Sequence, residues 1–145
     1  RFRAEKIGLV FQQFHLIPYL TALENVMLAQ HYHSVIDEAA AKAVLEQVGL
    51  GHRIDHRPSQ LSGGEQQRGC IARALVNQPP VIFADEPTGN LDEKNEELVL
   101  DLLQELNRQG RTIVMVTHNP ELGELTDRVI YLHHGKFVKE DIHEK

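Results

Sequence analysis

The chain has 145 residues, of which 41% are hydrophobic and 25% are charged, as in an ordinary folded domain. This composition excludes the disordered, collagen-like and low-complexity classes, and the length leaves room for about one domain. The 21 acidic and 15 basic side chains give a formal charge of −6, which argues against a domain that grips nucleic acid through its phosphates.

A single cysteine, Cys70, allows neither an intrachain disulfide nor a paired-cysteine zinc site, which indicates a reducing, cytosolic setting. The apolar runs are far shorter than the roughly 20 residues that cross a bilayer, so we expect any membrane role to be peripheral. The first residues include neither an initiating Met nor a signal peptide, and this start is typical of an excerpt.

The first part of the chain is predicted to form a strand and then a helix. An apolar run at 7–11 predicts a buried strand that ends where Gln12 begins a polar pair. Thr21 and Glu24 have the spacing of a capping box, which predicts a short helix that extends to about Ala29.

Two further helices are predicted before the middle of the chain. Apolar residues at helical spacing over 36–48 predict an amphipathic helix that stops at Gly49. Ser62 is expected to cap another helix, which must end at the Pro79-Pro80 pair.

The second half is predicted to alternate strands with a helix. Continuous apolar runs at 81–84 and 112–116 predict two strands buried on both faces. A stripe of leucine and valine over 98–106 predicts a helix that packs into the core between them, which makes a parallel crossover. A further strand is expected at 129–132, followed by a turn at 134–136.

Two acids, Asp85 and Glu86, come directly after the first of these strands. The carboxyl ends of strands in open α/β sheets are where such folds bind ligands. One carboxylate could hold Mg²⁺, and the other could orient or polarise an attacking water. The alternative is an acidic strand end that only caps the following turn.

Ser62, Gly63 and Gly64 open a predicted helix. Adjacent glycines let backbone N–H groups approach a phosphate closely, and a helix N-terminus favours its negative charge. The plain alternative is a turn and a helix cap without any ligand.

Four segments together resemble the ATP-binding cassette of ABC transporters. LSGGEQQR at 61–68 is similar to the signature motif, and VIFADEPTGNLD at 81–92 is similar to the Walker B motif followed by the D-loop. VFQQF at 10–14 resembles the Q-loop, and VTHNPEL at 116–122 resembles the switch-histidine region. They follow the family's order, and their wording is most similar to the bacterial lipoprotein-release and macrolide-export branch.

The resemblance implies a transport ATPase that uses ATP and Mg²⁺. By position, Gln12 would sense Mg²⁺ and couple to the membrane subunit, and Asp85 would hold the ion. Glu86 would act on the hydrolytic water, and His118 would contact the γ-phosphate of ATP.

The resemblance also implies partners. Ser62, Gly63 and Gly64 would bind ATP held by a second cassette in a head-to-tail homodimer, and Asp92 would lie across that interface. The segment 14–23 would contact a transmembrane permease. No nucleic-acid partner is expected, and the implied location is the cytoplasmic face of the bacterial inner membrane.

The implied fold is α/β: the C-terminal part of a P-loop NTPase (RecA-like) core with a mainly parallel sheet, plus an α-helical subdomain that carries the signature. Residues 1–20 would hold the Q-loop strand and the coupling segment. Residues 21–78 would form the helical subdomain, and residues 79–145 the α/β core with Walker B, D-loop and switch histidine.

The sequence departs from the family at two places. The phosphate-binding loop G-x-x-x-x-G-K-[ST] does not occur in these 145 residues, so we expect either an excerpt of a longer ATPase or, less expected, a natural truncation. In either case, we expect the chain by itself to hydrolyse ATP negligibly. Gly69 stands in the signature helix where the family usually has a β-branched residue, which predicts that Gly69→Val stabilises the fold.

Other functions fit less well. DNA-repair and chromosome-structure ATPases insert coiled coils or zinc modules between the Q-loop and the signature, yet only 50 positions separate Gln12 from Ser62. Ribosome-acting cassettes need a second cassette. A non-hydrolysing remnant that lends its signature to a partner's ATP stays open. Four histidines, His31, His33, His133 and His134, are interpreted as solvated surface because no ligand-spaced acids or cysteines accompany them.

Overall fold

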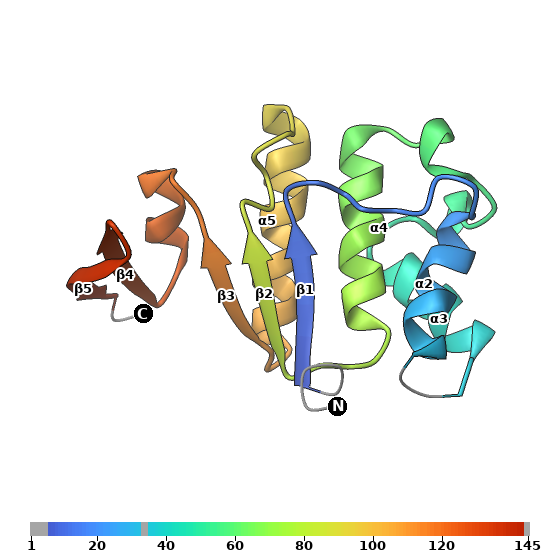
Figure 1. Cartoon of the computed structure of the whole chain (residues 1–145), viewed down its shortest axis with the longest axis horizontal. Coiled ribbons are helices and arrows are strands. Elements are labelled where there is room, and N and C mark those ends of the chain that lie inside the picture. Colours follow the sequence, from blue (N-terminus) through green and yellow to red (C-terminus); the bar gives the residue numbers. More distant parts are fainter. Residues whose placement is uncertain (1–5, 33–34, 144–145) are drawn as a thin grey trace.

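The computed structural model describes residues 6–32 and 35–143 and shows an α/β chain (Figure 1). Its elements, with 3-10 helices labelled η, are β1 (Ile7–Phe11), α2 (Ala22–His31), α3 (Glu38–Gln47), η1 (Gly51–Arg53), η2 (Pro58–Gln60), α4 (Gly63–Leu75), β2 (Val81–Asp85), α5 (Glu93–Arg108), β3 (Thr112–Val116), η3 (Pro120–Leu125), β4 (Arg128–His133) and β5 (Lys136–Ile142). Among the described residues, none of the helices combines the length and apolarity that a bilayer span needs.

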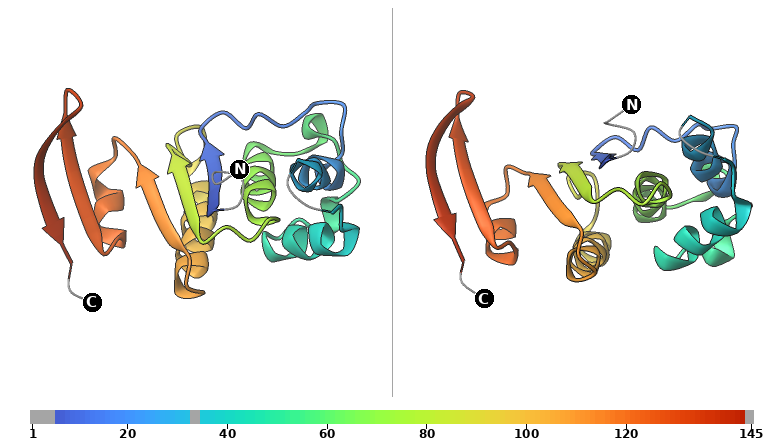
Figure 2. Two further views of the ribbon diagram at one scale, coloured as in Figure 1. Left: turned by 60° about the horizontal axis from the view of Figure 1, so that its bottom comes forward. Right: turned by 90° about the horizontal axis from the view of Figure 1, so that it is seen from below.

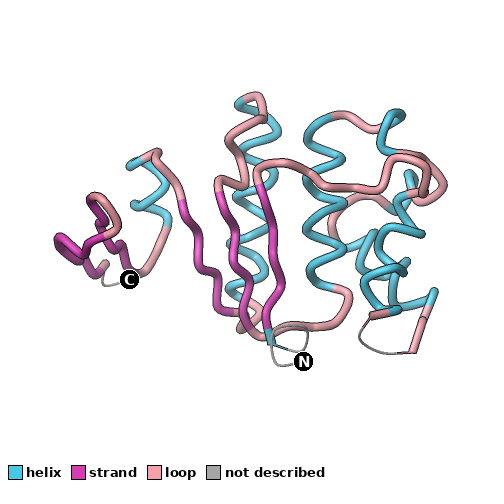
Figure 3. Tube along the Cα trace, in the orientation of Figure 1, coloured by secondary structure: helices cyan, strands magenta, loops and turns pink. Residues whose placement is uncertain are grey.

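Three parallel strands form the central sheet in the order β1-β2-β3. The three lie side by side in Figure 3, and the arrows in Figure 1 show that their carboxyl ends lie at one edge. The pairing places Phe11 beside Asp85, and Asp85 beside Val116. As predicted, α5 makes the crossover from β2 to β3. This register brings the residues that follow each strand to one edge of the sheet.

Helices α2 and α4 begin where their sequence caps predicted. Thr21 caps α2 and Ser62 caps α4, and in each case a glutamate three residues later accepts a hydrogen bond from the cap residue's N–H. Helix α4 ends at Leu75, ahead of the Pro79-Pro80 pair. The capping box predicted at Thr21 is confirmed, and the cap predicted at Ser62 forms a second capping box with Glu65.

Helix α3 is shorter than its apolar pattern predicted. The Asp37 side chain accepts a hydrogen bond from the Ala40 N–H, so the helix begins at Glu38. Ile36 therefore precedes the helix, and its side chain is exposed. A capping carboxylate outweighs an apolar residue one position earlier.

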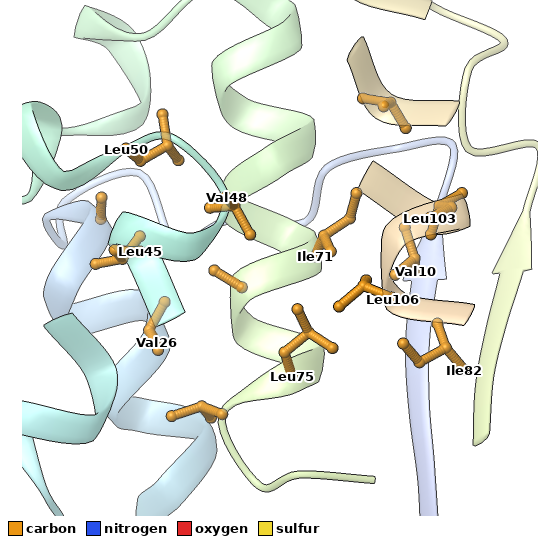
Figure 4. Packing of buried hydrophobic residues seen from close by; sticks show 14 of the residues in the cluster. Val10, Val26, Leu45, Val48, Leu50, Ile71, Leu75, Ile82, Leu103 and Leu106 are labelled. Atoms are coloured by element: carbon orange, nitrogen blue, oxygen red, sulfur yellow. The ribbon is translucent and has the colours of Figure 1, made fainter. Parts of the chain in front are cut away.

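One hydrophobic core joins the sheet to the helices (Figure 4). Side chains of Val10 and Ile82 on the sheet belong to the same buried cluster as Ile71 of α4, Leu106 of α5 and Leu45 of α3. The core is thus continuous across the position proposed as a subdomain boundary, and the division into 1–20, 21–78 and 79–145 stays a prediction.

Within residues 6–32 and 35–143 the apolar strands are covered on one face only, whereas the sequence predicted burial on both. Helix α5 lies against one face of the sheet (Figure 2), and residues alternate between covered and exposed along β2 and β3. Five apolar side chains point to the other face and are 37–56% exposed: Leu9, Phe11, Phe83, Val114 and Val116. We call these five the open sheet face. A continuous apolar run predicts a strand, but it does not show whether both faces are covered.

The leucine-rich face of α5 is only partly in the core. Val99, Leu103 and Leu106 are buried, whereas Leu98 is exposed. Leu98 is adjacent to Val99 in sequence and so projects about 100° away from it around the helix, beyond the surface that packs on the sheet.

The last two strands form an antiparallel hairpin. Strand β4 and the turn at His134 and Gly135 occur as predicted, with Gly135 at φ +73°. Strand β5 was not predicted from the sequence, because Lys139, Glu140 and Asp141 interrupt its apolar pattern.

Candidate functional site

The carboxyl edge of the sheet gathers four predicted site residues. Gln12 follows β1, Asp85 ends β2, Glu86 comes next, and His118 lies two residues beyond β3. The Glu86 N–H donates to the Val116 carbonyl at 2.8 Å, which extends the β2–β3 pairing by one step. Glu86 therefore lies directly beside the end of β3.

Glu86 and His118 form a direct pair. A carboxylate oxygen of Glu86 lies 2.8 Å from the backbone N of His118 and 2.8 Å from its Nδ1. An ionised carboxylate only accepts hydrogen bonds, so Nδ1 carries the proton that joins the pair. This arrangement leaves Nε2 of a largely exposed ring available to a ligand.

The backbone at Glu86 is unusual. Its φ is +45°, in the left-handed region that residues other than glycine seldom adopt. This turn takes the chain out of β2 and aims the Glu86 carboxylate toward β3, where the Thr117 hydroxyl also lies 3.4 Å from it. Strained backbone of this kind is common at functional sites.

Gln12 is fastened to the loop that follows β2. Its side-chain amide donates to Asn90 Oδ1 at 3.3 Å, and the Asn90 amide donates to the Gln12 carbonyl at 3.2 Å. A Cβ on Gly89 would lie only 2.7 Å from the Gln12 amide nitrogen, so a larger residue there would displace Gln12. Asn90 belongs to the predicted D-loop segment, but the sequence did not predict its hydrogen bonds with Gln12.

Asp85 is suited to hold a cation. Its side chain is exposed, and among the described residues its carboxylate has no hydrogen bond or ion pair. Mg²⁺ is commonly held by one or two carboxylates together with phosphate oxygens, and the donor set here fits that pattern. Within residues 6–32 and 35–143, no group of three or more His, Cys, Asp or Glu side chains is placed to hold a metal by itself.

The signature segment forms a second group of predicted residues. The Ser62 hydroxyl accepts from the Glu65 N–H at 3.2 Å, and the Glu65 carboxylate accepts from the Ser62 N–H at 2.8 Å. Arg53 donates to the other Glu65 oxygen at 3.1 Å. The Ser62 N–H, foremost, and the Arg53 charge hold the pKa of Glu65 below its usual value.

Asp92 and Gly64 lie in this second group, joined through Asn95. Asp92 caps α5 by accepting from the Asn95 N–H and side-chain amide, which holds the pKa of Asp92 below its usual value. A Cβ on Gly64 would lie 2.0 Å from Asn95 Oδ1. Gly64 therefore has a packing reason to be glycine, whereas a Cβ on Gly63 would make only ordinary contacts, the closest at 3.7 Å.

The remaining candidates are at the surface or inert. His31, His133 and His134 are exposed, and His33 lies outside the described residues. Cys70 is buried, which raises the pKa of its thiol to about 12, so it has little nucleophilic character.

Comparison with known proteins identifies the family. The model of the ABC transporter family matches residues 1–89, which is more than half of the chain. The chain belongs to the ABC transporter family. The fold agrees: a dimeric structure of the ATP-binding cassette MJ0796 bound to ADP and Pi superimposes with a TM-score of 0.85 at 44% identity, over 97% of this chain and 64% of that one.

Curated relatives of this ABC chain place it near two named systems. It is 51% identical over 140 residues to the lipoprotein-releasing system ATP-binding protein LolD of Xanthomonas oryzae, covering 94% of this chain and 57% of that protein. It is 50% identical over 135 residues to the macrolide export ATP-binding/permease protein MacB of Chlorobium luteolum, covering 92% and 20%. The predicted branch is confirmed, and the chain spans less than two thirds of the length of LolD.

Proposed function

We propose that the chain is part of an ATP-binding subunit that hydrolyses ATP to drive an ABC transporter. The observation that carries this proposal is the Glu86–His118 pair, 2.8 Å long, at the sheet edge next to Asp85 and Gln12. In this proposal the carboxylate would act on the attacking water, and the imidazole would contact the terminal phosphate. MJ0796, the cassette with the same fold, binds ADP and Pi.

Each residue of this edge would have one task. Glu86 accepts hydrogen bonds from His118, and the carboxylate held in this way would orient the attacking water. The exposed Nε2 of His118 would donate a hydrogen bond to the γ-phosphate, which requires this nitrogen to carry a proton as well as Nδ1. Asp85 and the side-chain oxygen Oε1 of Gln12 would hold Mg²⁺, which when bound offsets the phosphate charge.

The signature group would act on a second subunit. The first turn of α4, with Ser62 at its cap and Gly63 and Gly64 behind it, would bind the γ-phosphate of ATP held by another cassette in a head-to-tail dimer. Asp92 would lie at that interface, since it is fastened to the same turn through Asn95. The segment 14–23 would contact a transmembrane permease at the cytoplasmic face of the bacterial inner membrane.

ATP turnover by the full-length gene product, measured with Glu86→Gln, tests the proposal. The amide keeps the shape of Glu86 but is a far weaker base, so we expect turnover to fall by a factor of about 100 or more. Glu97→Gln, an exposed carboxylate on α5, is the matched control and should leave turnover unchanged. Turnover above half of the unsubstituted level in Glu86→Gln contradicts the proposal.

A second candidate function is that the chain only lends its signature to a partner's ATP. It is favoured by the signature group itself, whose hydrogen bonds at Ser62, Glu65 and Asp92 form without contact to Glu86 or His118. The 145-residue chain, mixed with an intact LolD whose own signature serine is replaced, tests this role. Restored turnover supports it, and failure to form a mixed dimer contradicts it.

A further inference from the structure

A buried amide on α4 connects the ends of β1 and β2. The Gln67 side chain is fully buried, and its amide nitrogen donates to the Phe11 carbonyl at 3.2 Å and to the Pro87 carbonyl at 2.7 Å. Phe11 immediately precedes Gln12, and Pro87 immediately follows Glu86. One side chain thus holds the backbone beside two candidate site residues from different strands.

The chemistry of this contact requires an amide. Both partners are carbonyl oxygens, which only accept, so the NH₂ group of Gln67 must face them. Its own oxygen, Oε1, is buried with no hydrogen-bond partner, and an unpartnered buried acceptor is unfavourable. A methionine would fill a similar volume without that cost. What glutamine adds is a pair of N–H donors at this point.

The contact also closes a ring of interactions around the sheet edge. From Pro87 the chain runs through Gly89 to Asn90, which exchanges hydrogen bonds with Gln12. Gln12 adjoins Phe11, and Phe11 returns to Gln67. Glu86, with its left-handed backbone, immediately precedes Pro87, a member of this ring. Removing the Gln67 donors opens the ring at two bonds while leaving the Gln12–Asn90 bonds in place.

We infer that Gln67 is a positioning residue for the nucleotide site: it sets the relative placement of Gln12 and Glu86 without contacting the nucleotide. The inference rests on the proposed function, since it assigns catalytic work to those two residues. Helix α4 packs directly on β1 (Figure 1), so Gln67 also ties the helix that carries the signature to the edge that carries Glu86.

Gln67→Met tests the inference, with Asn77→Leu as the matched control. Asn77 lies just beyond the C-terminal end of α4. Its side-chain amide donates a hydrogen bond to the Ala29 carbonyl at 3.1 Å, and its side-chain oxygen is also buried without a partner. The two substitutions therefore remove comparable amide donors, one from within α4 and one from just beyond its C-terminal end. Only Gln67 touches the backbone next to the candidate site.

Two measurements on the full-length gene product give the outcome. Amide hydrogen exchange at 12–14 and 88–90 should accelerate in Gln67→Met and remain unchanged in Asn77→Leu. The kcat for ATP should fall by about ten- to a hundredfold in Gln67→Met, as expected for displaced catalytic groups. Its KM for ATP should stay within about twofold, because the lost contacts do not bind substrate. Unchanged exchange at both segments, or equal effects in the two variants, overturns the inference.

A measurement on the unsubstituted protein covers the case in which Gln67→Met does not fold. Through-hydrogen-bond NMR couplings should connect Gln67 Nε2 to the carbonyl carbons of Phe11 and Pro87, and absence of both couplings also overturns the inference. A full-length product that neither binds nor hydrolyses ATP refutes the proposed function instead. The exchange and coupling results then still decide whether Gln67 holds the two backbone segments.

Discussion

At the residue scale, the packing of Asn95 against Gly64 requires glycine at this position, whether or not a ligand binds there. Its Cβ position lies 2.0 Å from Asn95 Oδ1 and 2.9 Å from Asn95 Cβ, so a methyl group there must push α4 and α5 apart. Overpacking of this kind typically costs about 1–3 kcal/mol. We expect Gly64→Ala to lower the free energy of unfolding by about that amount, measured by urea denaturation.

Gly63→Ala is the control for this prediction. Gly63 lies in the same helical turn as Gly64. Its new methyl group would lie 3.7 Å from Phe14 and 3.9 Å from Leu91, which are ordinary van der Waals distances. Its stability should stay within about 0.5 kcal/mol of the unsubstituted chain or rise. Equal losses in the two variants would show that any side chain in this turn is destabilising, and that Asn95 is not the cause.

At the scale of elements, α4 contains an avoidable glycine. A Cβ on Gly69 would meet Leu16 at 3.7 Å and Leu50 at 3.8 Å, so alanine fits without displacement. Alanine is favoured over glycine inside a helix by about 1 kcal/mol, and we expect Gly69→Ala to raise the free energy of unfolding by about that much.

Gly69→Val tests how much further the site can be filled. Its two extra methyl groups must share the space with Leu16 and Leu50, so its gain should not exceed that of Gly69→Ala. Thermal unfolding of both variants checks this order. A lower melting midpoint for Gly69→Ala than for the unsubstituted chain would refute the prediction.

The elements that local chemistry specifies are the ones that the sequence predicted well. Thr21 and Ser62 start helices through hydrogen bonds within four residues, and these are visible in the sequence alone. Gln67 and Asn95 were missed as partners of distant residues. A polar side chain on a helix looks the same in sequence whether it faces solvent or a buried carbonyl. For the same reason, the motifs indicated Gln12 and Glu86 as site residues. They did not indicate that the side-chain amides of Asn90 and Gln67 hydrogen-bond to Gln12 and to the neighbouring backbone.

At the scale of the whole molecule, the described residues leave the open sheet face uncovered, although its apolar sequence predicts burial. Its members come from all three strands and lie on one side of a continuous sheet, with Val116 56% and Leu9 46% exposed. Contiguous apolar patches larger than a few hundred Å² are rare on monomeric soluble proteins. We therefore expect the purified 145-residue chain to bind an apolar dye and to self-associate as its concentration rises.

Replacing two central members of the open sheet face separates this cause from general instability. Phe83→Thr with Val114→Thr keeps strand-forming residues while removing apolar surface, so dye binding and self-association should both fall. The same pair of changes at Phe137 and Val138 in β5 is the control. Those two side chains are also exposed, but adjacent strand residues point to opposite faces and do not share a patch. Dye binding that falls equally in both double variants would contradict the prediction. Exposed apolar area anywhere on the chain would then bind the dye, and the open sheet face would not be its specific cause.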